Sequence, residues 1–379
     1  MKIIFVGGGT SGHVNPAINL ALYIKKKDPD AEILYIGAKN GIEETLVRDV
    51  GLKFTSIKIS GFNRKFNLKS AWKNLITLAR VFISSYESKK IINKFKPEIC
   101  VGTGGYVCGP VLRSAYKLKI PFVIHEQNAI PGLTTRLLAS KASKIIISIN
   151  SARNFLNKFE SNIVNIGNPL QERKVLTRPQ ALDIINKKYK KKFDNTSKII
   201  LSFGGSLGAG KINEVMFEFM SETNDYCFVH GFGRNNPDFL SNFYKKNMDP
   251  NAENLILLKY IYDIYVFMIV ADLVICRSGS MSISELAILG KPTILIPSPN
   301  VTDNHQYYNA LALKNADAAS MIEEEKLNFN NLKKNVDHII NNKNIIKKYS
   351  KNIRKFASAD STKKIYDLIK NILKYNKKK

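Results

Sequence analysis

Four of the five histidines in this sequence follow segments that we predict to be β-strands; they are His13, His125, His230 and His305. An imidazole titrates near neutral pH, so it can accept a proton from a hydroxyl group that attacks a substrate. A single histidine is more often structural than catalytic. The position of each histidine in the fold must therefore decide which of them could act as a base.

The loop that contains His13 has the composition of an anion-binding site. Residues 7–12 satisfy the pattern G-x-G-x-x-G, which is frequent and not specific alone, and they follow an apolar segment at 3–6. Glycine lets the backbone approach a ligand closely, and the free amides at a helix start favour negative charge. A nicotinamide cofactor is disfavoured, because residues 36–39, at the end of the second predicted strand, offer no acid to hold its ribose.

A second glycine-rich loop, GGSLGAGKIN at 204–213, follows another apolar segment at 199–203. It is close to a P-loop, but Ile212 stands where a P-loop needs serine or threonine to hold magnesium, so we do not predict a P-loop nucleotidase. Ser206 and the nearby amides could still contact a phosphate. Two openings of this type, about 200 residues apart, predict two similar α/β domains facing each other across a cleft.

Acidic and amide side chains mark two further predicted helix starts. The stretch RSGSMSISE at 277–285 follows an apolar segment, and a helix that begins near Ser280 could receive a diphosphate. Glu285 could accept two hydrogen bonds from a ribose diol, although an acid is also favoured in the first turns of any helix. Asp-Asn-His-Gln at 303–306 would suit sugar hydroxyls, or would simply cap a helix.

The elements that would hold these loops alternate along the chain. With 379 residues and 44% hydrophobic content, two domains can each bury a core. Short apolar segments separated by helical patterns indicate parallel sheets, whose ligands lie at the carboxyl ends of the strands. We predict strands at residues 3–6, 33–36, 54–59, 99–101, 122–124, 145–149, 199–203, 226–230, 254–258, 273–276 and 293–296.

We predict a first domain at residues 1–168 and a second domain at residues 169–357. A lysine-rich stretch after Gly-Asn-Pro would separate them. The final helix, at about 358–379, is amphipathic and would return to the first domain. No stretch reaches the roughly 18 apolar residues of a spanning helix, and we expect no secretory signal.

The formal net charge of +27 indicates a surface that attracts phosphates, nucleic acid or anionic lipid. We expect no nucleic-acid partner, because glycine, serine and acidic residues, rather than basic and aromatic ones, gather at the predicted strand ends. We also expect no metal site. The four cysteines lack metal-ligand spacing, and Asp28-Pro29-Asp30 is typical of a surface turn.

Residues 62–82 combine an apolar stripe with basic side chains, as does a helix that lies in a membrane interface. An ordinary helix that packs its stripe on a sheet would have the same pattern. The candidates for contact with a membrane or a lipid acceptor are Phe62, Lys69, Trp72, Lys73, Leu75 and Arg80.

Seven motifs, in order and over nearly the whole chain, resemble the MurG family, the glycosyltransferases of bacterial cell-wall synthesis. They are GGGTSGHVNPA, GTGGYVCGP, HEQNAIPGLTTR, GNP, GGSLGAG, CRSGSMSISE and DNHQYYNA. The resemblance implies a GT-B fold, in which two Rossmann-like α/β domains face a cleft. It implies transfer of N-acetylglucosamine from UDP-N-acetylglucosamine to lipid I, giving lipid II in peptidoglycan synthesis, at the cytoplasmic face of the plasma membrane. A related transferase that uses another lipid acceptor, such as diacylglycerol, is the alternative.

The resemblance also assigns residues to roles. The second domain would hold the donor and the first would dock lipid I, which strengthens the membrane interpretation of residues 62–82. No cofactor would be obligatory, because helix starts and loop amides would stabilise the departing UDP. The implied donor-binding residues are Thr10, Ser11, Gly12, Asn128, Ser206, Ile261, Ser280, Met281, Ser282, Ile283, Ser284, Glu285 and Gln306.

We predict an inverting, single-displacement reaction with His13 as the base, and with His125 and Glu126 in reserve. One departure concerns charge. Gln171 stands where the GNPVR pattern of the family has arginine, so we expect one cationic contact to phosphate to be absent at this position. Arg173 could replace that contact only if the loop turns differently.

Overall fold

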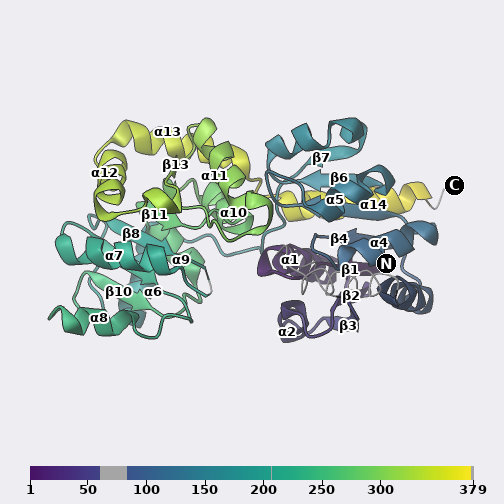
Figure 1. Cartoon of the computed structure of the whole chain (residues 1–379), viewed down its shortest axis with the longest axis horizontal. Coiled ribbons are helices and arrows are strands. Elements are labelled where there is room, and N and C mark those ends of the chain that lie inside the picture. Colours follow the sequence, from purple (N-terminus) through teal and green to yellow (C-terminus); the bar gives the residue numbers. More distant parts are fainter. Residues whose placement is uncertain (60–82, 206, 377–379) are drawn as a thin grey trace, which may run out of the picture. The chain divides into compact units, whose positions relative to one another are not determined.

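The structure, a computed structural model, describes residues 1–59, 83–205 and 207–376 (Figure 1). Within these ranges, no helix is long and apolar enough to cross a bilayer. Predicted contacts that lie outside the described residues are Ser206, Phe62, Lys69, Trp72, Lys73, Leu75 and Arg80.

The chain divides into two compact units. Unit 1 comprises Met1–Gln171 together with Ser358–Lys379, and unit 2 comprises Glu172–Ala357. The division follows Gln171, whereas the predicted boundary followed residue 168.

In its described part, unit 1 contains a seven-stranded parallel sheet in the order β3-β2-β1-β4-β5-β6-β7. The central strands are mostly apolar and are buried on both faces, as is usual for a parallel sheet covered by helices. The strands are β1 (Lys2–Val6), β2 (Glu32–Ala38), β3 (Lys53–Ile57), β4 (Ile99–Gly102), β5 (Phe122–Glu126), β6 (Lys144–Ile147) and β7 (Ile163–Asn165).

Within unit 1, helix α14 (Ser361–Asn376) packs on helix α1 (Ser11–Lys27) (Figure 1). The rings of Tyr23 and Tyr366 lie 5.8 Å apart, and Ile365 and Ile369 are fully buried. Residues 83–95 are also helical. The other helices of unit 1 are α2 (Ile42–Asp49), α4 (Cys108–Lys117), α5 (Leu133–Leu138), η1 (Ala139–Lys141), η2 (Asn150–Phe155) and η3 (Asn157–Asn162).

Unit 2 has, among its described residues, a six-stranded parallel sheet in the order β10-β9-β8-β11-β12-β13. Its strands are β8 (Ile199–Phe203), β9 (Cys227–Gly231), β10 (Leu255–Leu258), β11 (Leu273–Cys276), β12 (Thr293–Leu295) and β13 (Ser320–Met321). Its helices are α6 (Arg178–Tyr189), α7 (Gly210–Glu222), α8 (Phe239–Lys245), α9 (Ile264–Val270), α10 (Ser280–Leu289), η4 (Thr302–Asn304), α11 (His305–Asn315), η5 (Glu324–Lys326), α12 (Phe329–Ile340), α13 (Lys343–Ile353) and η6 (Arg354–Phe356).

These two sheets confirm the predicted pair of Rossmann-like α/β domains. In each sheet, the chain builds strands first on one side and then on the other side of the strand that precedes the glycine-rich loop. β1 lies between β2 and β4, and β8 lies between β9 and β11. The carboxyl ends of β1 and β8 are therefore topological switch points, where open α/β sheets bind ligands. The fold thus accounts for the position of both loops.

Candidate active site

The glycine loop between β1 and α1 is held by its own neighbours. The amide of Gly8 donates to the carbonyl of Gly104 at 3.3 Å, and that of Gly9 donates to Oε2 of Glu43 at 3.2 Å. Oε1 of Glu43 accepts a second hydrogen bond, of 2.8 Å, from the amide of Ala38, and the Glu43 side chain is fully buried. The prediction that free amides make this whole loop an anion site is therefore wrong for Gly8 and Gly9, whose donors are used internally.

His13, in the first turn of α1, has one bonded and one open ring nitrogen. Its Nδ1 lies 3.1 Å from the carbonyl oxygen of Thr103 and 3.1 Å from Oε1 of Gln127. Both atoms are acceptors, because Nε2 of Gln127 itself donates to the Thr103 carbonyl at 2.9 Å. The proton therefore belongs on Nδ1 and the lone pair on Nε2, to which no described residue is hydrogen-bonded. This is the tautomer that a general base requires.

The loop after β4 fixes the place of His13. Oγ1 of Thr103 donates to the backbone carbonyl of His13 at 2.7 Å. Gly104 has a φ of 104°, and a Cβ atom added there would lie 2.7 Å from Nδ1 of His13. Only glycine suits this close approach and this backbone conformation.

His125, on β5, is bonded at both ring nitrogens. Nδ1 accepts a hydrogen bond of 2.8 Å from Nε2 of Gln127, and Nε2 donates to the carbonyl of Gly167 at 3.1 Å. The side chain is 2% exposed, and burial lowers the pKa of His125 to about 4. His125 is therefore neutral and fully engaged, which favours a positioning role over that of a reserve base.

Glu126 organises the loop between β5 and α5. Its carboxylate accepts hydrogen bonds from the amides of Asn128, at 3.2 Å, and Gly132, at 3.0 Å, and from Oγ1 of Thr135, at 2.7 Å. It is 4% exposed. Because these hydrogen bonds occupy the carboxylate, Glu126 is poorly suited to act as the reserve base. One of them also fixes the backbone of Asn128, a predicted donor-binding residue.

The other predicted donor residues of unit 1 lie at the start of α1. Thr10 and Ser11 are exposed and Gly12 is partly exposed. Thr10 precedes the helix in an extended conformation, and its side chain makes no capping hydrogen bond. A ligand could therefore meet the Thr10 hydroxyl and the first amides of α1.

In unit 2, the first turns of α10, which follows the loop after β11, gather five predicted donor residues. Ser280, Ile283 and Ser284 are buried, whereas Met281 and Ser282 are partly exposed. Backbone amides at this start are the groups that suit a diphosphate.

Glu285, one turn further along α10, is paired with a cation. NH2 of Arg173 lies 3.2 Å from Oε1 of Glu285, and the guanidinium lies 4.9 Å from the ring centre of Tyr265. Burial raises the pKa of Glu285, and the charge of Arg173 opposes that rise. The structure therefore brings Arg173 to the predicted donor residue Glu285. The sequence predicted that Arg173 could replace the arginine missing at Gln171 only if the loop after Gly-Asn-Pro turned differently from the family pattern.

Gln306 lies at the same edge of the sheet. Its backbone carbonyl accepts a hydrogen bond of 2.7 Å from Oγ of Ser278, just before α10, and its Oε1 accepts one of 3.0 Å from the amide of Ser298. Ile261 is 8% exposed, and a Cβ atom added at Gly231 would lie 2.8 Å from its Cδ1 atom. The predicted sugar contact is thus near α10, and Ile261 packs closely against β9.

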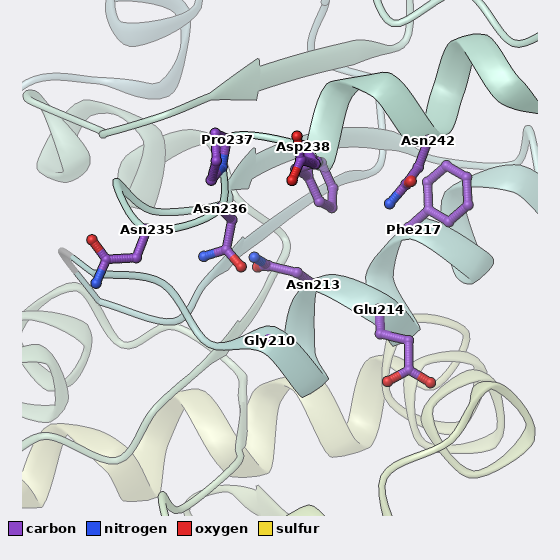
Figure 2. Close-up of a pocket in the computed structure, with 10 residues that line it drawn as sticks. Gly210, Asn213, Glu214, Phe217, Asn235, Asn236, Pro237, Asp238 and Asn242 are labelled. Carbon is purple, nitrogen blue, oxygen red and sulfur yellow. The ribbon is translucent and has the colours of Figure 1, made fainter.

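A pocket of about 320 Å³, partly lined by asparagines, lies beside the start of α7 (Figure 2). One lining residue, Asn213, accepts a hydrogen bond of 3.2 Å from Nε2 of His230, whose Nδ1 lies 2.7 Å from Oγ of Ser202. His230 is fully buried, and burial lowers its pKa to about 3. His230 is therefore structural, and no predicted site residue lines this pocket.

Gln127 was given no role from the sequence, and Arg173 was considered only as a replacement for the arginine that the family pattern has at Gln171. Gln127 links His13 to His125, and Arg173 pairs with Glu285. The only sequence feature that pointed to Gln127 is its position directly after the candidate bases His125 and Glu126. The contacts of Gln127 with the two histidines, and of Arg173 with Glu285, cannot be predicted from residue spacing. In the described part of the chain, no group of three or more histidine, cysteine or acidic side chains could hold a metal.

Comparisons with known proteins agree along the whole chain. Residues 3–147 match the glycosyltransferase family 28 N-terminal domain, and residues 199–372 match the glycosyltransferase family 28 C-terminal domain. The chain is 37% identical, over 99% of both sequences, to a protein of Acetivibrio thermocellus named UDP-N-acetylglucosamine--N-acetylmuramyl-(pentapeptide) pyrophosphoryl-undecaprenol N-acetylglucosamine transferase. It is also 37% identical to the protein of that name from Ruminiclostridium cellulolyticum, over 98% of this chain and 100% of the relative.

Solved structures agree on the fold. The crystal structure of Acinetobacter baumannii MurG matches with a TM-score of 0.76 at 23% identity, covering 98% of this chain and 99% of that one. A UDP-GlcNAc 2-epimerase from Neisseria meningitidis, bound to UDP-GlcNAc, matches with a TM-score of 0.64 at 15% identity, covering 98% of this chain and 100% of that one.

Proposed function

The chain belongs to glycosyltransferase family 28, and from that premise we propose how its residues transfer N-acetylglucosamine from UDP-N-acetylglucosamine to lipid I, which gives lipid II. The assignment of these substrates is supported by one observation: the chain is 37% identical, over 99% of both sequences, to a relative named for this reaction. The parallel-sheet units and their switch-point loops are the scaffold that such a transfer needs.

His13 is the base of the reaction. Its Nε2 takes the proton of the acceptor 4-hydroxyl as that oxygen forms a bond to the anomeric carbon. The bond from that carbon to the diphosphate oxygen breaks at the same time, and UDP leaves with the electron pair. The proton on Nδ1, held by Thr103 and Gln127, supports this role because it fixes the lone pair on Nε2.

Unit 2 holds the donor. Glu285 accepts hydrogen bonds from the ribose diol, and the start of α10 places amides against the diphosphate, where negative charge grows as the sugar departs. Amide donors and the helix dipole can carry this charge without an obligatory metal or cofactor. Gln306, next to the α10 loop, contacts the sugar.

The enzyme works at the cytoplasmic face of the membrane, attached peripherally, because its acceptor is a lipid. The net charge of +27 suits a surface of anionic phospholipid. Sedimentation with vesicles of phosphatidylglycerol or of phosphatidylcholine tests this attachment. Binding that is stronger to the anionic vesicles, and that weakens with salt, is expected; equal binding to both would contradict it.

Radiolabelled UDP-N-acetylglucosamine, offered with a lipid I analogue or with diacylglycerol, tests the reaction. We expect labelled product only with the lipid I analogue, and product only with diacylglycerol would overturn the acceptor. In the same assay, His13→Ala should lower kcat by roughly 10²–10⁴-fold with little change in donor KM. Unchanged turnover would reject His13 as the base.

A further inference from the structure

A cation from the segment that joins the two units reaches the donor site of unit 2. Arg173 follows the boundary at Gln171 by two residues, and its NH2 lies 3.2 Å from Oε1 of Glu285. The two side chains are 29% and 21% exposed, so water screens this pair less than it screens a surface pair. The guanidinium also lies over the ring of Tyr265, on α9, at 4.9 Å, which limits the directions it can take.

We propose that Arg173 is a positioning residue for donor recognition, which orients the Glu285 carboxylate so that it binds the ribose diol. This inference rests on the proposed function, in which Glu285 holds the ribose. Arg173 would supply a positive charge that the chain lacks at Gln171, where the related GNPVR pattern carries arginine.

The geometry explains how such a residue would act. A carboxylate has two oxygens and can accept several hydrogen bonds. Arg173 occupies one direction of Oε1, and no described residue donates to Oε2 of Glu285. One oxygen is thereby fixed while the other stays open, so the carboxylate is oriented before the two hydroxyls of a diol arrive.

Binding of UDP and of 2′,3′-dideoxy-UDP, measured by calorimetry, separates this role from a general structural one. The wild type should bind UDP about tenfold more tightly than the dideoxy nucleotide, since only UDP offers hydroxyls to a charged acceptor. Arg173→Gln should weaken UDP binding about tenfold and change dideoxy-UDP binding less than twofold, so that the preference disappears. Arg173→Lys, which keeps the charge without the planar fork, should keep part of the preference.

Lys174→Gln is the matched control, because it removes the same charge from the adjacent, exposed position and should leave both affinities unchanged. Retained binding of dideoxy-UDP shows that a variant is folded. Equal weakening of both nucleotides by Arg173→Gln, or no weakening of either, would overturn the proposal. A wild type that transfers the sugar but does not prefer UDP would overturn it while leaving the proposed function intact. A wild type that binds neither nucleotide would overturn both.

Discussion

Acidification should destabilise unit 1 through His125, and replacing this residue should remove that sensitivity. His125 is 2% exposed, with its nitrogens bonded to Gln127 and Gly167, and burial lowers its pKa to about 4. Its pKa in an unfolded chain is about 6.5. As the pH falls below about 6.5, the unfolded chain takes up a proton that the folded unit does not, so the free energy of unfolding decreases until the pH reaches about 4.

The size of this effect follows from the two pKa values. Each pH unit between them costs about 1.4 kcal/mol, so moving from about pH 7.5 to about pH 5 should cost unit 1 about 2 kcal/mol through His125 alone. His125→Gln cannot titrate, although its amide can still reach the Gly167 carbonyl. It should lose roughly 1–3 kcal/mol at neutral pH, where one hydrogen bond is missing, and then show a weaker dependence on pH.

Urea unfolding followed by far-UV circular dichroism, at about pH 7.5, 6 and 5, measures this difference. His338→Gln, at an exposed position of α12, is the control and should keep the wild-type dependence. His230 is equally buried in unit 2, so the transition of that unit should stay acid-sensitive in the His125 variant. If His125→Gln lost as much stability on acidification as the wild type, the assignment of His125 as a buried neutral residue would be refuted.

Three further outcomes are expected. Gly104→Ala should lower turnover at least tenfold, because the added Cβ would lie 2.7 Å from Nδ1 of His13, while UDP affinity stays within about threefold; unchanged kcat would speak against the fixed imidazole. Glu43→Gln should cost about 1.5–3 kcal/mol in urea unfolding, because it removes a charged acceptor from the amides of Gly9 and Ala38; no loss would show that this carboxylate does not hold the loop. UDP affinity should fall as the pH drops through the raised pKa of Glu285, whose protonated form is the weaker acceptor, and calorimetry on Glu285→Gln should show no such fall.

Much of the fold could be predicted because its signals are local. A continuous apolar run such as that of β11 is buried on both faces of its sheet, and such a run can be recognised in the sequence without knowledge of its partner strands. β7 and β13 were missed because they lie at the edges of their sheets and are only partly buried, so their short sequences form no apolar run. β12 is as short as β7 but is fully buried, and it was predicted.

The site was less predictable, because its chemistry depends on pairs that are distant in sequence. The loop around His13 was found from composition, but the state of its ring depends on Thr103 and Gln127, which come from two other loops. The anion site was predicted too broadly, since nothing in the spacing indicates that Glu43 binds the amide of Gly9. Such partners become evident only once the sheet has brought the loops together.

The place of α14 has a consequence for biosynthesis. This helix, formed by residues near the end of the chain, buries Ile365 and Ile369 in the same core as α1. On the ribosome, the whole of unit 2 is made before α14 emerges, so unit 2 can complete its core while unit 1 still exposes apolar surface. Unit 1 therefore buries the apolar surface that α14 covers only after all of unit 2 has been synthesised.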